Sequence, residues 1–129
     1  MILVDTSIWI ELLNGKLGTK VAAEELLSFV TSGPIVQEVL QGLRETAWAE
    51  PFREALLAMP RLGDPLPLRT FLSAAEIYRQ GRRKGYTIRS SVDCLIAAIA
   101  IESRVPVWHK DRDFRLITRY TSLEMVERW

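Results

Sequence analysis

The chain has 129 residues, 48% of them hydrophobic and 26% charged, which is ordinary for one folded domain spanning residues 1–129. The formal net charge of +1 excludes a general electrostatic attraction to nucleic acid, so any such contact has to come from a local patch. Because Cys94 is the single cysteine, no internal disulfide is possible, and with no membrane-length apolar run and no signal-peptide pattern we expect a cytoplasmic protein.

The N-terminal stretch predicts a buried strand followed at once by a helix. Residues 2–4 are an unbroken aliphatic run that suits a strand of a parallel sheet. Asp5 follows directly, and Thr6 or Ser7 is expected to cap the helix that continues to Leu13. Asp5 therefore stands at the carboxyl end of a strand, where ligands bind in open α/β sheets, although helix capping explains it equally well.

The middle of the chain predicts helices and one short strand. The expected order is a loop at 16–19, a helix at 21–27, a strand at 29–31, a helix from Ser32-Gly33-Pro34 to about 43, a helix at 46–59 whose start Pro51 shifts, a turn-rich link at 60–67 and a helix at 71–83. Glu38 lies at the margin of an apolar stripe, an unusual place for an acid, although a solvated helix surface accounts for it as well.

The last third of the chain predicts a buried helix and further strands. Ser90 and Asp93 have the spacing of a capping box, which by itself explains Asp93. The helix that they open, up to Ser103, is apolar all round, so we expect it at the centre of the molecule. A strand at 105–108, a helix at 114–120 and a closing strand at 123–126 follow. This alternation predicts an α/β fold, a three-layer α/β/α sandwich with a mostly parallel central sheet.

Several acids of the chain are placed so that they can converge in one cleft, if the first strand and the 105–108 strand are neighbours in the sheet. They are Asp5, Glu38, Asp93 and Asp111, with Asp113 beside the last. Two carboxylates about 5 Å apart repel by roughly 3 kcal/mol at an effective dielectric constant near 20. Protonation or a bound cation has to relieve that repulsion, and oxygen ligands favour Mg²⁺ or Mn²⁺ over zinc.

Four segments of the chain are similar to those of a known family. They are Asp5-Thr6-Ser7, Gln37-Glu38-Val39-Leu40, the run from Ser90 through Asp93 to Ala98, and His109 through Phe114. With them the whole chain resembles the PIN domain, and more narrowly the VapC ribonuclease toxins of toxin–antitoxin pairs. The chain departs from the pattern at Ser32-Gly33-Pro34, where some relatives carry an accessory acid.

The resemblance implies a catalytic and metal-binding site. Its residues are the quartet Asp5, Glu38, Asp93 and Asp111, with Asp113 as a further metal ligand and Ser7 as an accessory hydroxyl. Between the two neighbouring acids we favour Asp111 as the ligand, because it is nearer to the strand end. The implied cofactor is Mg²⁺ or Mn²⁺. Metal-assisted hydrolysis would leave 5′-phosphate and 3′-hydroxyl ends, because it needs no RNA 2′-hydroxyl as nucleophile.

The resemblance also implies partners. The expected substrate is RNA, either tRNA or rRNA, whose cleavage inhibits translation, and the expected protein partners are a VapB-like antitoxin and a second copy of the chain. Arg89 and Arg112 are the expected RNA contacts, with the basic cluster at 79–84 as a further candidate. A solvated helix end explains residues 82–84 of that cluster at least as well.

Two other functions remain open from the sequence. One is an aspartate-nucleophile phosphatase built on Asp5, although such enzymes carry a second acid two positions on, where this chain has Ser7. The other is a catalytically inactive PIN-like binding module. His109 has no partner at metal-ligand spacing, which favours a hydrogen-bonded strand-end histidine. The aromatic side chains of Trp9 and Trp48 are expected in the core or in an interface rather than as base-stacking platforms.

Overall fold

The computed structural model describes residues 1–15 and 21–126, so the loop expected at 16–19 lies outside the described residues. Within them the chain forms four strands and seven helices. In chain order these are β1 (Ile2–Val4), α1 (Thr6–Leu13), α2 (Ala23–Leu26), β2 (Phe29–Val30), α3 (Gly33–Gln41), α4 (Ala49–Ala58), α5 (Leu68–Arg83), α6 (Ser91–Ser103), β3 (Val107–Trp108), α7 (Arg112–Thr118) and β4 (Met125–Val126).

The four strands form one parallel sheet in the order β2-β1-β3-β4. Leu3 pairs with Val30 on one side and with Val107 on the other, so β1 lies between β2 and β3. The chain thus leaves β1 in one direction and returns to its other side, which makes the carboxyl ends of β1 and β3 the place where ligands bind in such sheets. The predicted α/β/α sandwich with a parallel central sheet is confirmed, and so is the predicted neighbourhood of the two strands.

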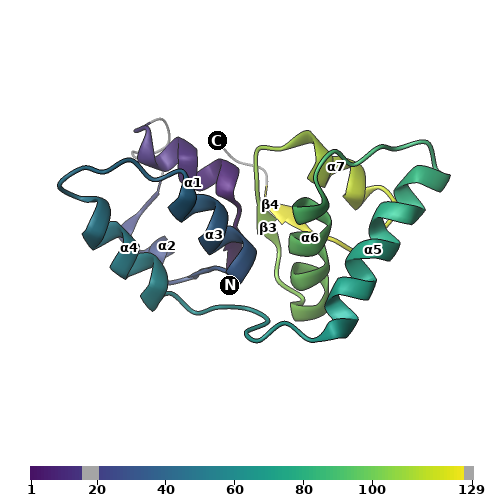
Figure 1. Ribbon diagram of the computed structural model, residues 1–129, viewed down its shortest axis with the longest axis horizontal. Coiled ribbons are helices and arrows are strands. Elements are labelled where there is room, and N and C mark those ends of the chain that lie inside the picture. Colours follow the sequence, from purple (N-terminus) through teal and green to yellow (C-terminus); the bar gives the residue numbers. More distant parts are fainter. Residues whose placement is uncertain (16–20, 127–129) are drawn as a thin grey trace.

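Helix α6 lies at the centre of the molecule, as its apolar sequence predicts. Five consecutive residues, Ile96 to Ala100, are at most 1% exposed, and Cys94 near its start is a buried free thiol. The helix packs against α5, α3 and α7. Figure 1 shows α1, α3 and α4 gathered on one side of the view and α5, α6 and α7 on the other, with β3 and β4 near the middle. None of the described helices is long and apolar enough to cross a membrane.

Several predicted boundaries are displaced. Helix α4 begins at Ala49, so Pro51 falls in its first turn, where the missing amide hydrogen costs nothing. Helix α5 begins three residues before the predicted start, directly after Pro67, which is its N-cap residue. The strands β3 and β4 keep only the last two residues of the predicted runs.

The expected caps at Thr6 or Ser7 and at Ser90 are wrong, whereas the alternative that Asp5 caps the first helix is confirmed. Asp5, rather than Thr6 or Ser7, is the N-cap of α1, and its side chain accepts a hydrogen bond from the Ser7 amide. Ser90 occupies the N-cap position of α6 but makes no side-chain capping hydrogen bond. The capping box that would have explained Asp93 is therefore absent, and this acid needs another explanation.

Candidate active site

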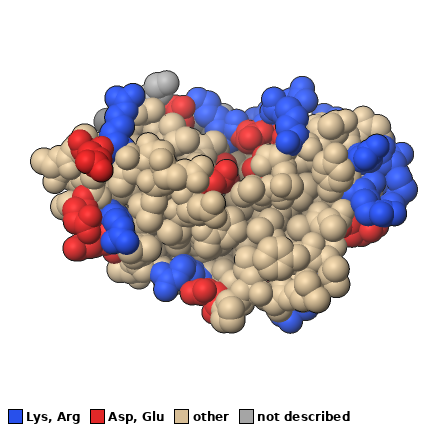
Figure 2. Space-filling view, viewed as in Figure 1, with Lys and Arg blue, Asp and Glu red and all other residues tan. Residues whose placement is uncertain are grey.

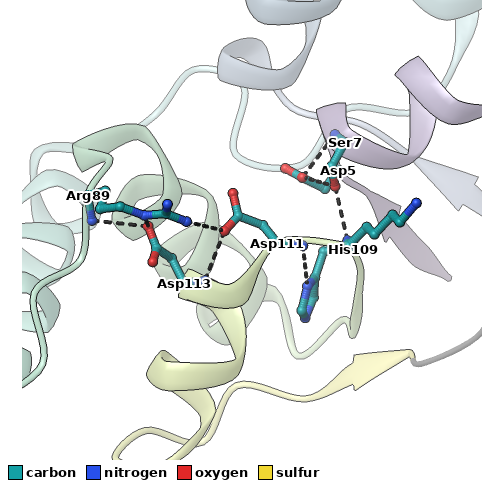
Figure 3. Close-up of polar contacts among 7 residues, drawn as sticks. Asp5, Ser7, Arg89, His109, Asp111 and Asp113 are labelled. Atoms are coloured by element: carbon teal, nitrogen blue, oxygen red, sulfur yellow. Dashed lines mark hydrogen bonds and ion pairs between the residues drawn. The ribbon is translucent and has the colours of Figure 1, made fainter.

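Asp5 is held at the carboxyl end of β1 by a hydroxyl group two residues further on. Its Oδ2 accepts hydrogen bonds from the Ser7 amide at 3.0 Å and from Ser7 Oγ at 2.6 Å. Ser7 Oγ in turn accepts a hydrogen bond from the Lys110 amide at 3.1 Å, so one hydroxyl links the segments that follow β1 and β3 (Figure 3). Burial raises the pKa of Asp5, although the Ser7 hydrogen bonds act in the opposite direction. Asp5 therefore caps a helix and also belongs to the site.

Glu38 reaches the same region from α3. Its Oε1 accepts a hydrogen bond at 2.9 Å from Thr6 Oγ1, at the start of α1. The negative charge of Glu38 contributes to raising the pKa values of both Asp5 and Asp93, so it lies close enough to interact with them. Thr6 is a site residue that the sequence interpretation treated only as a cap. The position of Thr6 next to Asp5 was the one indication of this role, and nothing in the sequence indicated that Glu38 is its hydrogen-bond partner.

Three further carboxylates form the closest group of acids among the described residues. One oxygen from each of Asp93, Asp111 and Asp113 lies within 4.8 Å of the others. Asp93 comes from the first turn of α6, while Asp111 is the N-cap of α7 and Asp113 lies in its first turn. The structure thus brings Asp93 on α6 together with two acids at the start of α7. Figure 2 shows acidic side chains between the two groups of helices, and Lys and Arg side chains along the same upper edge.

Asp93 is the most strongly perturbed acid of this group. It is only 7% exposed, and its pKa is raised to about 8, chiefly by burial. The charges of the other acids add to this effect, first Asp5 and then Asp111, Asp113 and Glu38. The other four acids of the predicted set therefore all lie near enough to Asp93 to raise its pKa.

Arg89 provides a positive charge at the edge of the cluster. Its backbone amide donates to Asp113 Oδ2 at 3.0 Å, its Nε lies 3.4 Å from the same oxygen, and its Nη2 lies 3.6 Å from Asp111 Oδ1 (Figure 3). The Arg89 side chain is 63% exposed, so it is open to solvent while it pairs with both acids. Arg112, the other predicted RNA contact, is exposed at the first position of α7.

His109 is buried beside the cluster and is not one of its charged members. Its Nδ1 accepts a hydrogen bond from the Asp111 amide at 3.3 Å, and its Nε2 lies 3.1 Å from Met125 Sδ. Burial lowers the pKa of His109 to about 4, so the ring is neutral at physiological pH. The prediction of a hydrogen-bonded strand-end histidine is confirmed, and the ring helps to set the backbone of Asp111.

The chemistry of the donors fits a hard divalent cation. The side chains of the cluster offer carboxylate oxygens only, which is the ligand type of Mg²⁺ and Mn²⁺. Asp113 Oδ1 is buried and accepts no hydrogen bond within the described part of the chain. A buried carboxylate oxygen without a partner is costly, and a cation is one group that relieves this cost.

Known proteins share both the sequence and the fold. Residues 2–120 match the PIN domain family. VapC ribonuclease Mb1587 from Mycobacterium bovis and ribonuclease VapC11 from Mycobacterium tuberculosis are each 36% identical to this chain over 130 residues, covering 96% of it and 96% of the relative. Among solved structures, VapBC-1 from nontypeable Haemophilus influenzae has a TM-score of 0.70 at 18% identity, with 98% of both chains covered. The chain therefore belongs to the PIN domain family, and its curated relatives within that family are VapC ribonucleases.

Proposed function

We propose that this protein is a divalent-metal-dependent endoribonuclease, the toxin of a toxin–antitoxin pair. The observation that carries the proposal is the approach of the Asp93, Asp111 and Asp113 carboxylates to within 4.8 Å, in the electrostatic neighbourhood of Asp5 and Glu38. Such a concentration of negative charge in a buried site is tolerated when a cation or protons compensate it. The VapC ribonuclease relatives support RNA as the substrate.

The proposed ligands of Mg²⁺ or Mn²⁺ are Asp5, Glu38, Asp93 and Asp111, with Asp113 as an additional one. When bound, such a cation supplies a water molecule of lowered pKa and positive charge for the phosphate in the transition state. Asp111 is preferred over Asp113 as the principal ligand because it is half-buried and reachable, whereas Asp113 is 1% exposed.

The chain's own groups prepare this chemistry. Ser7 fixes one oxygen of Asp5, and Thr6 fixes one oxygen of Glu38, so both carboxylates are oriented before the substrate arrives. Asp93, with its pKa near 8, holds a proton on its carboxyl group at neutral pH in the metal-free protein and has to release it to act as a ligand. Because the attacking group is water, we expect products with 5′-phosphate and 3′-hydroxyl ends.

The proposed substrate is tRNA or rRNA, whose cleavage would inhibit translation in the cytoplasm. Arg89 and Arg112 are exposed cations beside the carboxylates and are the proposed phosphate contacts. A free enzyme of this kind would harm its host, so we propose a VapB-like antitoxin as partner. Solved structures support the fold on which this proposal depends. One of them is VapBC2 from Rickettsia felis, which has a TM-score of 0.69 at 19% identity and covers 100% of this chain and 99% of its own. We further propose that residues 1–129 form a single domain and that two copies of the chain form a homodimer.

The two alternatives are less well supported. A phosphatase nucleophile at Asp5 would need a second acid two positions on, but Ser7 stands there and donates two hydrogen bonds to Asp5 Oδ2. A non-catalytic binding module would have no need of a buried acid, Asp93, with four other acids around it. The assay below separates this alternative from the enzyme.

The test is cleavage of tRNA by the purified protein in Mn²⁺, repeated with EDTA and with the isosteric substitutions Asp5→Asn and Asp93→Asn. We expect EDTA to abolish cleavage and each substitution to reduce its rate roughly 100-fold or more, because each removes a charged oxygen from the site. The matched control is Glu54→Gln, which removes one negative charge from an exposed position of α4. Products with 2′,3′-cyclic phosphate ends, or undiminished cleavage by both variants, would contradict the proposal.

A further inference from the structure

A pocket of about 370 Å³ opens beside the acid cluster, between α1, α3 and the segment that leads to α4. Glu38 is part of its lining and is also one of the acids that act on Asp93. The pocket and the proposed cleavage site thus share a side chain. A molecule in the pocket would lie against Glu38, one of the carboxylates proposed to hold the metal.

The lining of this pocket combines flat apolar walls with a few polar groups. Ile10 and Leu13 come from α1, and the indole of Trp48 comes from the residue before α4. Trp48 is 46% exposed and Ile10 is 48% exposed, so both present apolar surface to solvent. Trp48 therefore does not lie in the core, which was one of the two places, core or dimer interface, expected for it from the sequence. It is held by Phe52, whose ring it meets in a T-shaped arrangement with the centroids 6.5 Å apart.

Two polar groups suit a nucleotide in particular. The Asn14 amide offers both a donor and an acceptor, which matches the edge of a nucleobase. Arg44 is an exposed cation in the lining and suits a phosphate of the RNA backbone. The volume is at the small end of the range for ligand pockets, which fits one nucleoside.

We propose that this pocket binds the base of a nucleotide adjacent to the scissile phosphate, with the base stacked on Trp48 and the neighbouring phosphate on Arg44. The inference rests on the proposed ribonuclease function and adds a determinant of where the RNA is cut. Unpaired bases stack on aromatic side chains, and their edges are recognised by hydrogen bonds, so Asn14 would select among bases while Trp48 supplies affinity.

The first test is RNA binding in EDTA, where no cleavage occurs, measured by fluorescence polarisation with labelled single-stranded oligoribonucleotides. We expect Trp48→Ala to weaken binding about tenfold or more and Trp48→Phe to retain most of it, because a phenyl ring still stacks. Arg44→Gln should weaken binding to all sequences alike. It should also reduce the slope of log K against log salt concentration by about 1, because one phosphate contact is lost. Phe71→Ala is the matched control, because Phe71 on α5 is also an aromatic side chain with 46% exposure but lines a different pocket.

The second test maps the 5′ ends of total RNA cleaved in Mn²⁺. We expect Trp48→Ala to raise KM and to flatten the base preference next to the cut, with the Mn²⁺-induced thermal shift unchanged. If the wild type cleaves but Trp48→Ala has the same KM, binding and base preference, the pocket proposal is overturned. It is also overturned if that variant cleaves normally but escapes its VapB-like antitoxin, because the pocket would then bind protein. Trp48-dependent RNA binding without cleavage would support the pocket and contradict the ribonuclease.

Discussion

At the scale of single residues, the acids of this chain serve the fold and the site together. Asp5 caps α1 and Asp111 caps α7, yet both also contribute charge to the cluster around Asp93. The structural and the functional interpretations of Asp5 were therefore never exclusive. Asp93 is different, because the cap that would have explained it is not formed. Its burial among like charges is a cost to the metal-free fold.

This cost predicts how the stability of the metal-free protein depends on pH. The pKa of Asp93 is about 8 in the fold and near 3.8 in the unfolded chain. Between these values the unfolded chain has lost the proton and the folded chain still holds it, so the free energy of unfolding falls as the pH rises through this window. Asp93→Asn removes the cost, and in EDTA at pH 8 we expect it to raise Tm by roughly 5 °C or more, measured by calorimetry.

Measuring the change in Tm caused by Asp93→Asn at pH 4 as well as at pH 8 provides the control. At pH 4 the folded wild type is protonated at Asp93 and the unfolded chain has lost only about half of that proton, so the gain in Tm from Asp93→Asn should be a small fraction of the gain at pH 8. Glu54→Gln, at an exposed site on α4, should leave the difference between the two pH values as it is in the wild type. A gain in Tm that is equal at pH 4 and pH 8 would mean that Asp93 is not titrating in this window.

At the scale of elements, the contact between α5 and the segment after α7 depends on residue 81 being a glycine, which has no side chain. A Cβ atom on Gly81 would lie 2.6 Å from Tyr120 Oη and 3.2 Å from Tyr120 Cζ. The Tyr120 hydroxyl donates to the Ile77 carbonyl of the same helix at 2.8 Å. The tyrosine hydroxyl thus lies close against α5, and α5 and α7 are in contact.

Gly81→Ala should therefore reduce the free energy of unfolding by about 1–3 kcal/mol, measured by urea denaturation, although alanine favours helices over glycine. Adding Tyr120→Phe removes the nearest atom, so the double variant should recover part of the loss. Gly33→Ala is the control, because no heavy atom lies within 4 Å of its Cβ position at the start of α3. Additive losses in the double variant would show that the hydroxyl is not the source of the clash.

The same scale shows what the sequence can and cannot predict. The apolar run of α6 and the aliphatic run of β1 identified a central helix and a buried strand, because burial on all sides leaves no polar face in the pattern. The start of α5 was misplaced because Leu68 is 72% exposed and gives no periodic signal there. The hydrogen bond from Thr6 to Glu38 joins residues 32 apart, and local patterns carry no information about such partners.

At the scale of the whole molecule, the sheet order decides whether the acids form a site. Asp5 and Asp111 follow neighbouring strands, so their convergence was predictable once β1 and β3 were placed side by side. The position of Arg89 was not predictable as an ion-pair partner of Asp111 and Asp113, because the loop before α6 folds onto α7 only in three dimensions. The basic residues Arg79 and Arg83 pair instead with Glu76 on α5.

Because the site joins β1, α3, α6 and α7, a cation bound there should stabilise the whole fold, and Cys94 offers a way to measure this. It is the single cysteine of the chain, it is 1% exposed, and burial raises the pKa of its thiol to about 11. A buried thiol of high pKa reacts with iodoacetamide only when the protein opens. Mn²⁺ at about 100 times its Kd lowers the population of the metal-free protein that can open, so alkylation should slow by roughly 100-fold.

The slowing should follow 1 + [Mn²⁺]/Kd across a titration, with Kd taken independently from calorimetry, and EDTA should restore the fast rate. In Asp5→Asn and Asp93→Asn, which lose a proposed ligand, the same Mn²⁺ concentrations should have little effect. NaCl at matched ionic strength separates binding from charge screening, because screening would slow alkylation with either salt. If Mn²⁺ binds by calorimetry but alkylation is indifferent to it, α6 opens without disturbing the carboxylates, and the site and the core are not one cooperative unit.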